Sequence, residues 1–153
     1  MVSPVDKAKT ARLFQDFRKA VEVLKTLKET PEPEFLANIE KQGAAKYFFI
    51  VAIESAIDIC NHIIAEHRWG QPTEYAEVFR VMGEAGVFPL PLVAELELMA
   101  KFRNLLVHVY GQVDDRRVYQ ILQTRLTDFD QLEACLQSYL RAQEADAGDD
   151  VTM

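Results

Sequence analysis

The sequence has few of the residues that build disulfide scaffolds and metal centres. Its 153 residues include two cysteines and three histidines. Cys60 and Cys135 lie in apolar, helix-like surroundings, and with no disulfide framework and no signal peptide they indicate a reduced protein of the cytoplasm. No Glu-x-x-His pair accompanies His62, His67 or His108, which argues against a zinc site or a di-iron bundle. We therefore expect no metal and no cofactor.

Long apolar runs and glycine-rich loops are also missing. The longest apolar run, Tyr47–Ile53, stops at Glu54 and is much shorter than the roughly 20 residues that a helix needs to cross a bilayer. Gly83, Gly86 and Gly111 fall at expected helix ends rather than in a phosphate-binding loop. The sequence therefore predicts neither a membrane span nor a nucleotide-binding loop of the glycine-rich kind.

The charge balance of the chain is acidic, with a formal net charge of −7 at pH 7. Proteins that hold nucleic acid non-specifically do so by neutralising phosphates with lysine and arginine, so this balance argues against a broad nucleic-acid-binding surface. It leaves room for a local basic site around Lys101, Arg103, Arg116 and Arg117.

The pattern of apolar residues is helical from end to end, with no alternating strand pattern and no internal repeat. It predicts an all-α fold, a bundle of about five helices formed by residues 1–143. Proline- and glycine-containing segments separate the helices. Residues 144–153 are acidic with small side chains and are expected to form a disordered tail. The helices are expected over residues 4–30, 34–68 with a bend at Gly43, 73–84, 90–111 and 116–142.

Most of the functional information lies in the segment AKFRNLLVHVYG, residues 100–111. It sets Arg103, His108 and Tyr110 on an otherwise apolar helix that ends in a glycine. A guanidinium holds phosphate by charge-assisted hydrogen bonds, and an imidazole exchanges a proton near neutral pH, so this pair suits cleavage of a phosphodiester. Tyr110 adds a hydroxyl group that is open to modification.

Helix geometry separates the two candidate catalytic side chains. Arg103 lies in the apolar stripe, whereas His108 lies on a narrow polar sector about 140° away. The two side chains meet only if the last turn before Gly111 loosens or if two protomers complete the site. A third edge of the helix is also apolar, which predicts a contact with a second subunit. This edge consists of Leu98, Leu105 and Val109.

A second polar stripe lies on the helix expected over residues 34–68, where Tyr47 and Asn61 accompany two carboxylates. Glu54 and Asp58 are four residues apart and repel each other unless a cation lies between them. Arg103 is the candidate partner. A purely structural ion pair explains this pattern equally well.

The run FRNLLVHVYGQVD, with the upstream AIESAIDICNHII and VFRVMGEAGVFPLPLVAELELMAKFRN, resembles the HepT family of HEPN-domain proteins over roughly residues 10 to 140. The resemblance implies a homodimeric helical bundle in which two R-x4-H-x-Y motifs face a shared cleft. It also implies a toxin of a toxin–antitoxin module that is a metal-independent endoribonuclease. Arg103 and His108 would be the ribonuclease pair, with Glu54, Asp58 and Asn104 as supporting residues.

The same resemblance implies a partner protein, a minimal nucleotidyltransferase antitoxin of the MntA type. In the family this partner transfers AMP from ATP to the motif tyrosine, here Tyr110. A different class of function remains open: a non-catalytic helical dimer that binds a nucleotidyltransferase and presents substrate or nucleotide to it. Only the intact His108 favours the nuclease. A purely structural dimer leaves the motif unexplained.

Overall fold

The computed structural model describes the backbone of residues 4–151 and the side chains of residues 7–109 and 111–146. This part of the chain contains no strand, which confirms the all-α prediction. Its seven α-helices and one 3₁₀ turn are α1 (Pro4–Lys28), α2 (Glu32–Leu36), α3 (Ile39–His67), α4 (Tyr75–Glu84), α5 (Leu90–His108), η1 (Tyr110–Gln112), α6 (Asp115–Thr124) and α7 (Leu126–Val151).

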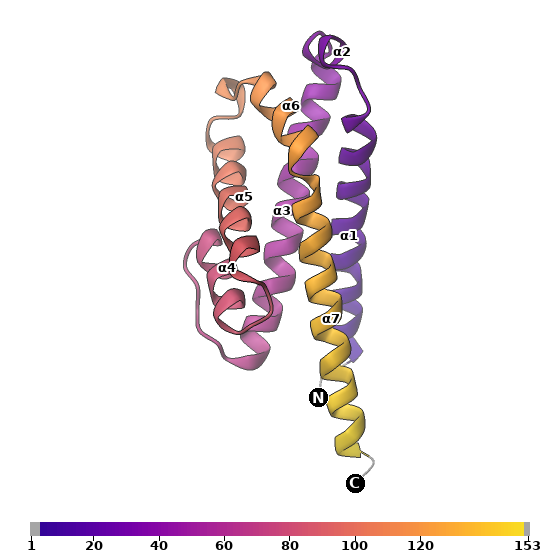
Figure 1. Cartoon of the computed structure of the whole chain (residues 1–153), viewed down its shortest axis with the longest axis vertical. Coiled ribbons are helices and arrows are strands. Elements are labelled where there is room, and N and C mark those ends of the chain that lie inside the picture. The colour runs from indigo at the N-terminus through magenta and orange to yellow at the C-terminus, as the bar shows by residue number, and fades with distance from the viewer. Residues whose placement is uncertain (1–3, 152–153) are drawn as a thin grey trace.

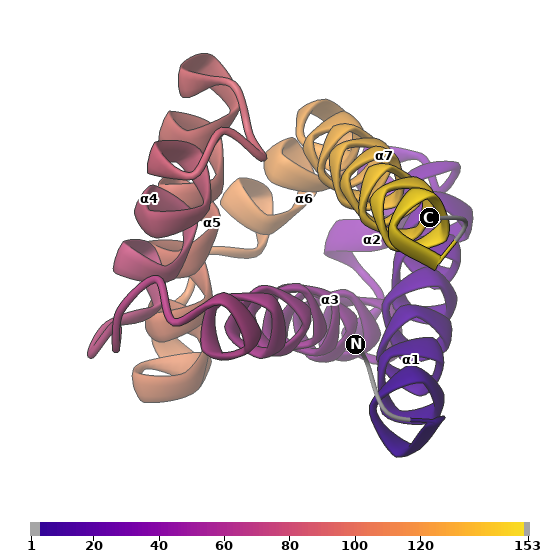
Figure 2. The same ribbon diagram turned by 90° about the horizontal axis from the view of Figure 1, so that it is seen from below.

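The long helices form a bundle around α3, as Figures 1 and 2 show. α3 lies between α1 on one side and the α4–α5 pair on the other, and it contacts all three. α7 runs beside α1, while the short α6 crosses one end of the bundle between α5 and α7. α3 and α5 run in opposite directions, so the C-terminal end of α5 lies near the N-terminal half of α3.

Four aromatic rings join the four longest helices through the core. The ring of Phe49 on α3 lies 5.3 Å from that of Phe102 on α5 and 6.4 Å from that of Phe129 on α7. Phe17 on α1 contacts Phe129 edge-on at 5.8 Å. Such pairs add about 0.5–1.5 kcal/mol each to the stabilisation from burial alone. They fix the position of α5 against α3, and α5 carries the candidate site.

The number of helices differs from the predicted five because two expected helices are each broken. The helix expected over 34–68 divides into α2 and α3. Asn38 has an extended backbone between them, and its side chain accepts a hydrogen bond from the N–H of Lys41 at 3.0 Å. This cap satisfies a free N–H at the start of α3, so the break precedes Gly43, which lies inside α3.

The second break is at Arg125, between α6 and α7. No proline or glycine marks it. Thr124 donates its hydroxyl hydrogen bond to the carbonyl of Gln120 at 2.7 Å, and Arg125 pairs with Glu95 of α5 at 2.7 Å. The change of direction lets α6 bury Val118 and Leu122 at the end of the bundle, while α7 packs along its length.

Helix α3 is long and apolar enough, by length and composition, to cross a membrane, with a mean hydropathy of 1.7 in its most apolar window. In the bundle 56% of that window is buried against other helices. The core of a helical bundle explains this composition without a membrane.

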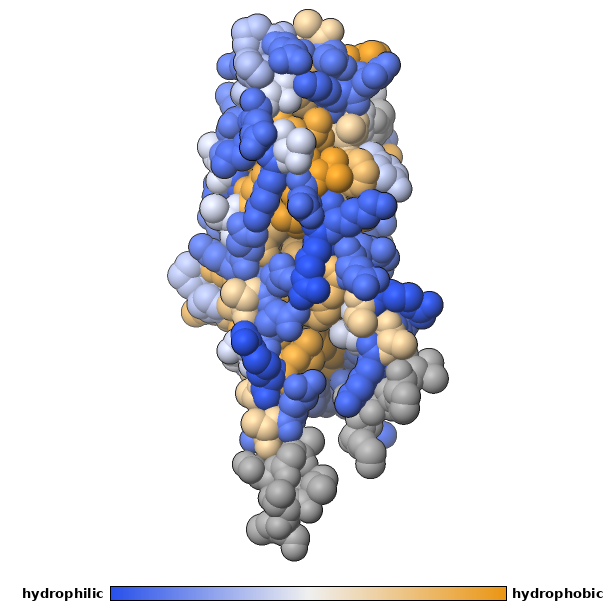
Figure 3. Space-filling view, turned by 90° about the vertical axis from the view of Figure 1, so that its right-hand side faces the viewer, coloured by the Kyte–Doolittle hydropathy of each residue, from blue (hydrophilic) through white to orange (hydrophobic). Residues whose placement is uncertain are grey.

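The surface over α1 and α7 is mostly hydrophilic, unlike the apolar helix α3. Figure 3 shows mostly hydrophilic side chains there, with hydrophobic atoms only in narrow strips between them. Ion pairs join the two helices, between Arg18 and Glu133 and, at 2.8 Å, between Lys25 and Asp130. α7 continues to Val151, beyond the predicted domain boundary at residue 143. Residues 152 and 153 lie outside the described residues, and the boundary and the disorder of the tail stay predictions.

Candidate functional site

Arg103 of α5 is held by partners on its own helix and on two neighbouring helices, α3 and α4. Its Nε and Nη2 both donate hydrogen bonds to Oε1 of Glu54 on α3, at 2.9 and 2.7 Å, and its Nη1 donates to Oδ1 of Asn104 at 3.0 Å. The ring of Tyr75, at the start of α4, lies against the guanidinium, with Cζ 4.5 Å from the ring centre. Among the described residues, three of the five N–H donors are therefore used, and two are left for a ligand.

The two carboxylates on α3 have separate surroundings. Glu54 pairs with Arg103 as expected. Asp58 lies one turn further along and lines a pocket of about 430 Å³ towards α1, together with Lys9 and His62. Burial, and next the charge of Glu54, raise the pKa of the Asp58 carboxyl, and Lys9 opposes this shift. Among the described side chains no hydrogen bond or ion pair joins Asp58 to Arg103, because Asp58 faces α1 rather than α5.

His108 is the last residue of α5 and is exposed. Within the described part of the chain it makes no hydrogen bond or ion pair, with Arg103 or with any other residue. The helix ends here rather than at the predicted Gly111, because Val109 leaves the helical conformation at φ −131° and ψ 38°. The last turn does loosen, as one alternative required, but the two side chains stay on different faces of α5.

Tyr110 opens the 3₁₀ turn that follows α5. Its side chain lies outside the part of the molecule that the structure describes. The neighbouring Gly111 has open space where a Cβ would stand, with no atom within 4 Å. The backbone beside Tyr110 is therefore at the surface, and the role of its hydroxyl group stays a prediction.

Tyr75 is the residue of this site that the sequence pattern does not reveal. Glu77 fixes the start of α4 by accepting hydrogen bonds from the backbone N–H and the hydroxyl of Thr73, at 3.1 and 3.3 Å. This turn places Tyr75 over Arg103. The aromatic ring belongs to no motif, and only the packing of α4 against α5 brings the two residues together.

The described residues include no group of three or more His, Cys, Asp or Glu side chains that could hold a metal ion. The polar groups of the site are instead a fixed guanidinium, a carboxylate, an amide and an exposed imidazole. These groups can bind a phosphoryl group and exchange a proton.

A helical bundle of this shape, with Arg103 and His108 in the last turns of α5 and Tyr110 in the turn that follows, defines a HEPN-type protein. The family described as "Ribonuclease HepT-like" matches residues 17–136. The chain therefore belongs to the HepT-like ribonuclease family, which confirms the resemblance.

Two curated relatives support this assignment. The chain is 32% identical over 78 residues to the mRNA nuclease HepT of Shewanella oneidensis, a match that covers 51% of this chain and 59% of that protein. It is 24% identical over 117 residues to the tRNA nuclease HepT of Aphanizomenon flos-aquae, which covers 76% of this chain and 80% of that protein. The mRNA and tRNA nuclease activities in these names are those of the two relatives.

Solved structures share the fold. A tri-AMPylated HEPN toxin of Shewanella oneidensis in complex with its MNT antitoxin superposes with a TM-score of 0.78 at 21% identity, covering 84% of this chain and 96% of that one. YutE of Bacillus subtilis, a cytosolic protein of unknown function, gives a TM-score of 0.78 at 18% identity, covering 90% of this chain and 92% of that one.

The contact between Arg103 and Glu54 predicts a measurable coupling. In a double-mutant cycle of Arg103→Ala and Glu54→Ala, we expect a coupling energy of about 1–2 kcal/mol in urea unfolding. A fully buried pair would give more, but Glu54 is 40% exposed and water screens it. The matched control is the Arg80–Glu97 pair between α4 and α5, in which Arg80 is 54% exposed and a coupling of about 0.5 kcal/mol is expected. A smaller coupling for Arg103–Glu54 than for this control contradicts the reading.

Proposed function

We propose that this protein is the toxin of a toxin–antitoxin module and acts as a metal-independent endoribonuclease through Arg103 and His108. The observation that carries the proposal is the fixed guanidinium of Arg103, which keeps two N–H donors for a phosphate, on the same helix as the exposed His108. The nuclease names of both curated relatives support it. We expect the protein to act in the cytoplasm, since the structurally similar YutE is described as a cytosolic protein.

The chemistry needs no metal if the RNA supplies its own nucleophile. The 2′-hydroxyl oxygen attacks the adjacent phosphorus while one His108 imidazole takes the hydroxyl proton. The bond to the 5′ oxygen breaks, and a second His108, protonated, or a water gives that oxygen a proton. Arg103 holds the non-bridging phosphoryl oxygens as negative charge develops. General acid–base help of this kind contributes about 10²- to 10⁴-fold in rate.

A homodimer brings these groups together, because Arg103 and His108 of one protomer face apart. Two exposed apolar side chains beside the Arg103–Glu54 pair suit the contact: Tyr47 on α3 is 57% exposed and Val107 on α5 is 41% exposed. Since α3 and α5 are antiparallel, both lie beyond the ion pair towards the same end of the bundle. The predicted edge is also exposed, at Leu98 (53%) and Leu105 (38%), and it stays a prediction. We assign the dimer contact to the Tyr47–Val107 face because this face adjoins Arg103.

The regulator is a minimal nucleotidyltransferase of the MntA type. The Tyr110 oxygen attacks the α-phosphorus of ATP, pyrophosphate leaves, and the hydroxyl proton goes to solvent. The attached AMP brings a negative phosphate and a base next to His108, so it opposes RNA by charge and by volume. The tri-AMPylated state and antitoxin complex of the similar Shewanella toxin support this step. Because both curated relatives are named nucleases, they favour the nuclease over the non-catalytic docking dimer.

Loss of the imidazole tests the catalytic assignment. His108→Ala should lower the rate of RNA cleavage by about 10²-fold or more and relieve growth arrest on expression. The circular dichroism spectrum should not change, because His108 is exposed and has no polar partner among the described residues. His62→Gln on α3 is the control and should stay active. Full cleavage by a folded His108→Ala variant refutes the nuclease reading and leaves the docking dimer.

Assembly is tested by light scattering. The wild-type chain should have the mass of a dimer at micromolar concentration, and Val107→Asp should shift it to the monomer. Leu105→Asp makes the same chemical change on the other face of α5 and should leave a dimer. A monomeric wild type contradicts the two-histidine mechanism, and a monomer produced by Leu105→Asp alone moves the contact to the other edge.

Regulation is tested at Tyr110. Incubation with the cognate nucleotidyltransferase, ATP and Mg²⁺ should add one or more AMP groups there, detected by intact mass and peptide fragmentation, and cleavage should stop. Tyr110→Phe removes the acceptor oxygen and should stay toxic beside the partner. If the partner protects cells equally well from Tyr110→Phe, neutralisation proceeds by binding alone.

A further inference from the structure

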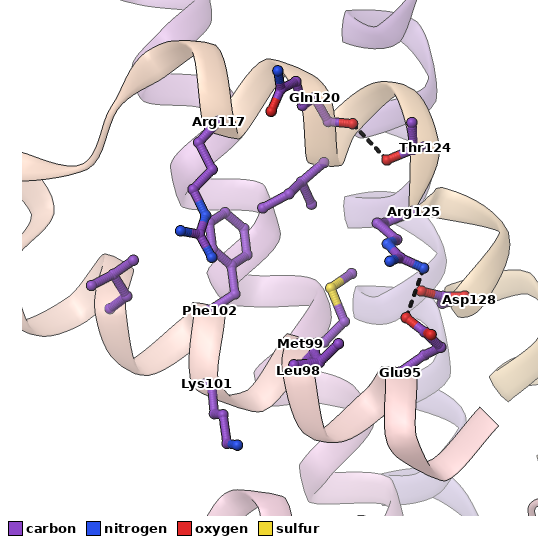
Figure 4. A pocket seen from close by; sticks show the side chains of 12 residues that line it. Glu95, Leu98, Met99, Lys101, Phe102, Arg117, Gln120, Thr124, Arg125 and Asp128 are labelled. Atoms are coloured by element: carbon purple, nitrogen blue, oxygen red, sulfur yellow. Dashed lines mark hydrogen bonds and ion pairs between the residues drawn. The ribbon is translucent and has the colours of Figure 1, made fainter. Parts of the chain in front are cut away.

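An open pocket of about 530 Å³ lies between α5, α6 and α7 (Figure 4). This volume lies in the range of small-ligand sites, about 300–1,000 Å³. The pocket is separate from the Arg103–Glu54 pair, and the function proposed above assigns no role to it. Its apolar lining comes from both sides, with Phe102 and Leu105 on α5 and Ile121 on α6 among the contributors.

The two ends of this pocket differ in charge. At one end stand Lys101 and Arg117, both exposed, and neither makes a hydrogen bond or ion pair within the described residues. At the other end Glu95 pairs with Arg125 at 2.7 Å, beside Asp128, which is only 6% exposed. The Oδ2 of Asp128 has no hydrogen-bond partner in the described part of the chain. Burial, and next the charge of Glu95, raise the pKa of this carboxyl against the effect of Arg125.

The cationic end adjoins the candidate catalytic histidine. Lys101, Leu105 and His108 follow each other at intervals of four and three residues on α5, so they lie on one face of the helix within about 60°. One turn of helix, about 5 Å, separates successive members. An extended ligand that is bound at His108 therefore reaches the cationic end of the pocket within about one helical turn.

We propose that this pocket binds one nucleotide of single-stranded RNA next to the cleaved phosphate. Lys101 and Arg117 hold its phosphate, and the base lies against the apolar side chains of the pocket. At the far end Glu95 is paired with Arg125, and the Oδ2 of Asp128, which has no partner among the described residues, is the acceptor for an N–H donor of the base, which fixes one orientation. This inference rests on the proposed ribonuclease function and states how its RNA is held.

Charge complementarity favours RNA over a second copy of the chain. The protein carries a net charge of −7, yet the cations at the mouth of this pocket lack acidic partners among the described residues. In a two-fold dimer centred here, the same patch would meet itself, and Lys101 and Arg117 would approach their own copies. Like charges placed together at an interface oppose association, whereas RNA phosphates compensate them.

The test measures binding apart from cleavage. In a His108→Ala background, fluorescence anisotropy follows a short fluorescent oligoadenylate over a range of salt concentrations. Lys101→Gln with Arg117→Gln should weaken binding about tenfold or more and reduce the slope of log K against log salt by about 1.4, or 0.7 for each lost phosphate contact. The control pair Arg12→Gln with Lys19→Gln removes the same charge from exposed positions on α1 and should change neither quantity.

The base contact is tested with an abasic oligomer of the same length. It should bind about tenfold or more weakly than oligoadenylate to the protein with an intact pocket. Leu105→Asp, which places a charge in the apolar part, should bind oligoadenylate as weakly as the abasic oligomer. Equal binding of the two oligomers overturns the proposal, and so does conversion of the dimer to a monomer by Leu105→Asp, because a second copy then covers the pocket.

These outcomes separate the pocket from the nuclease. If the chain cleaves RNA but the Lys101/Arg117 double variant keeps its affinity and salt slope, the pocket proposal fails and the proposed function stands. If RNA binds through the pocket but the protein with His108 never cleaves it, the proposed function fails and the pocket proposal stands.

Discussion

The double hydrogen bond from Arg103 to Glu54 is the constraint on which the site depends. An arginine side chain that is only 15% exposed must have compensating partners for its charge, and Glu54, Asn104 and the ring of Tyr75 supply them. These partners come from α3, α5 and α4, so the contact fixes the mutual position of three helices. It also leaves the outer N–H groups of a rigid fork as the part available to an anion.

The site is divided between two faces of α5. The side chain of Arg103 faces α3 and α4. His108 is the last residue of α5 and lies on the same side of the helix as Lys101 and the pocket between α5, α6 and α7. A straight α-helix fixes this separation at about 140°, and the end of α5 at His108 does not remove it. A catalytic centre that needs both groups is therefore incomplete in one protomer. Because the net charge of the chain is −7, the proposed binding of RNA must depend on local cations.

Periodicity and local chemistry were sufficient for the fold class, for the pairing of Arg103 with Glu54 and for the angle between Arg103 and His108. The helix breaks at Asn38 and Arg125 were not predicted from the sequence, because neither position holds a proline or glycine. The Asn38 cap is a local contact with Lys41 within a continuous helical pattern, whereas the break at Arg125 is accompanied by an ion pair with Glu95 that only the folded chain supplies. The role of Tyr75 and the pocket between α5, α6 and α7 were not predicted either, because their residues come together from distant segments only in the folded chain.

The position of Tyr110 gives the proposed modification a physical rationale. Its backbone begins the 3₁₀ turn directly after His108, at a point where Gly111 leaves open space. A phosphodiester attached there carries the same charge and the same acceptor oxygens as an RNA phosphate. It therefore competes for the same kind of donor, and because it is tethered its effective concentration is high without tight intrinsic binding. Covalent attachment thus turns a weak anion contact into lasting occupation of the region beside His108, which requires no change in the fold.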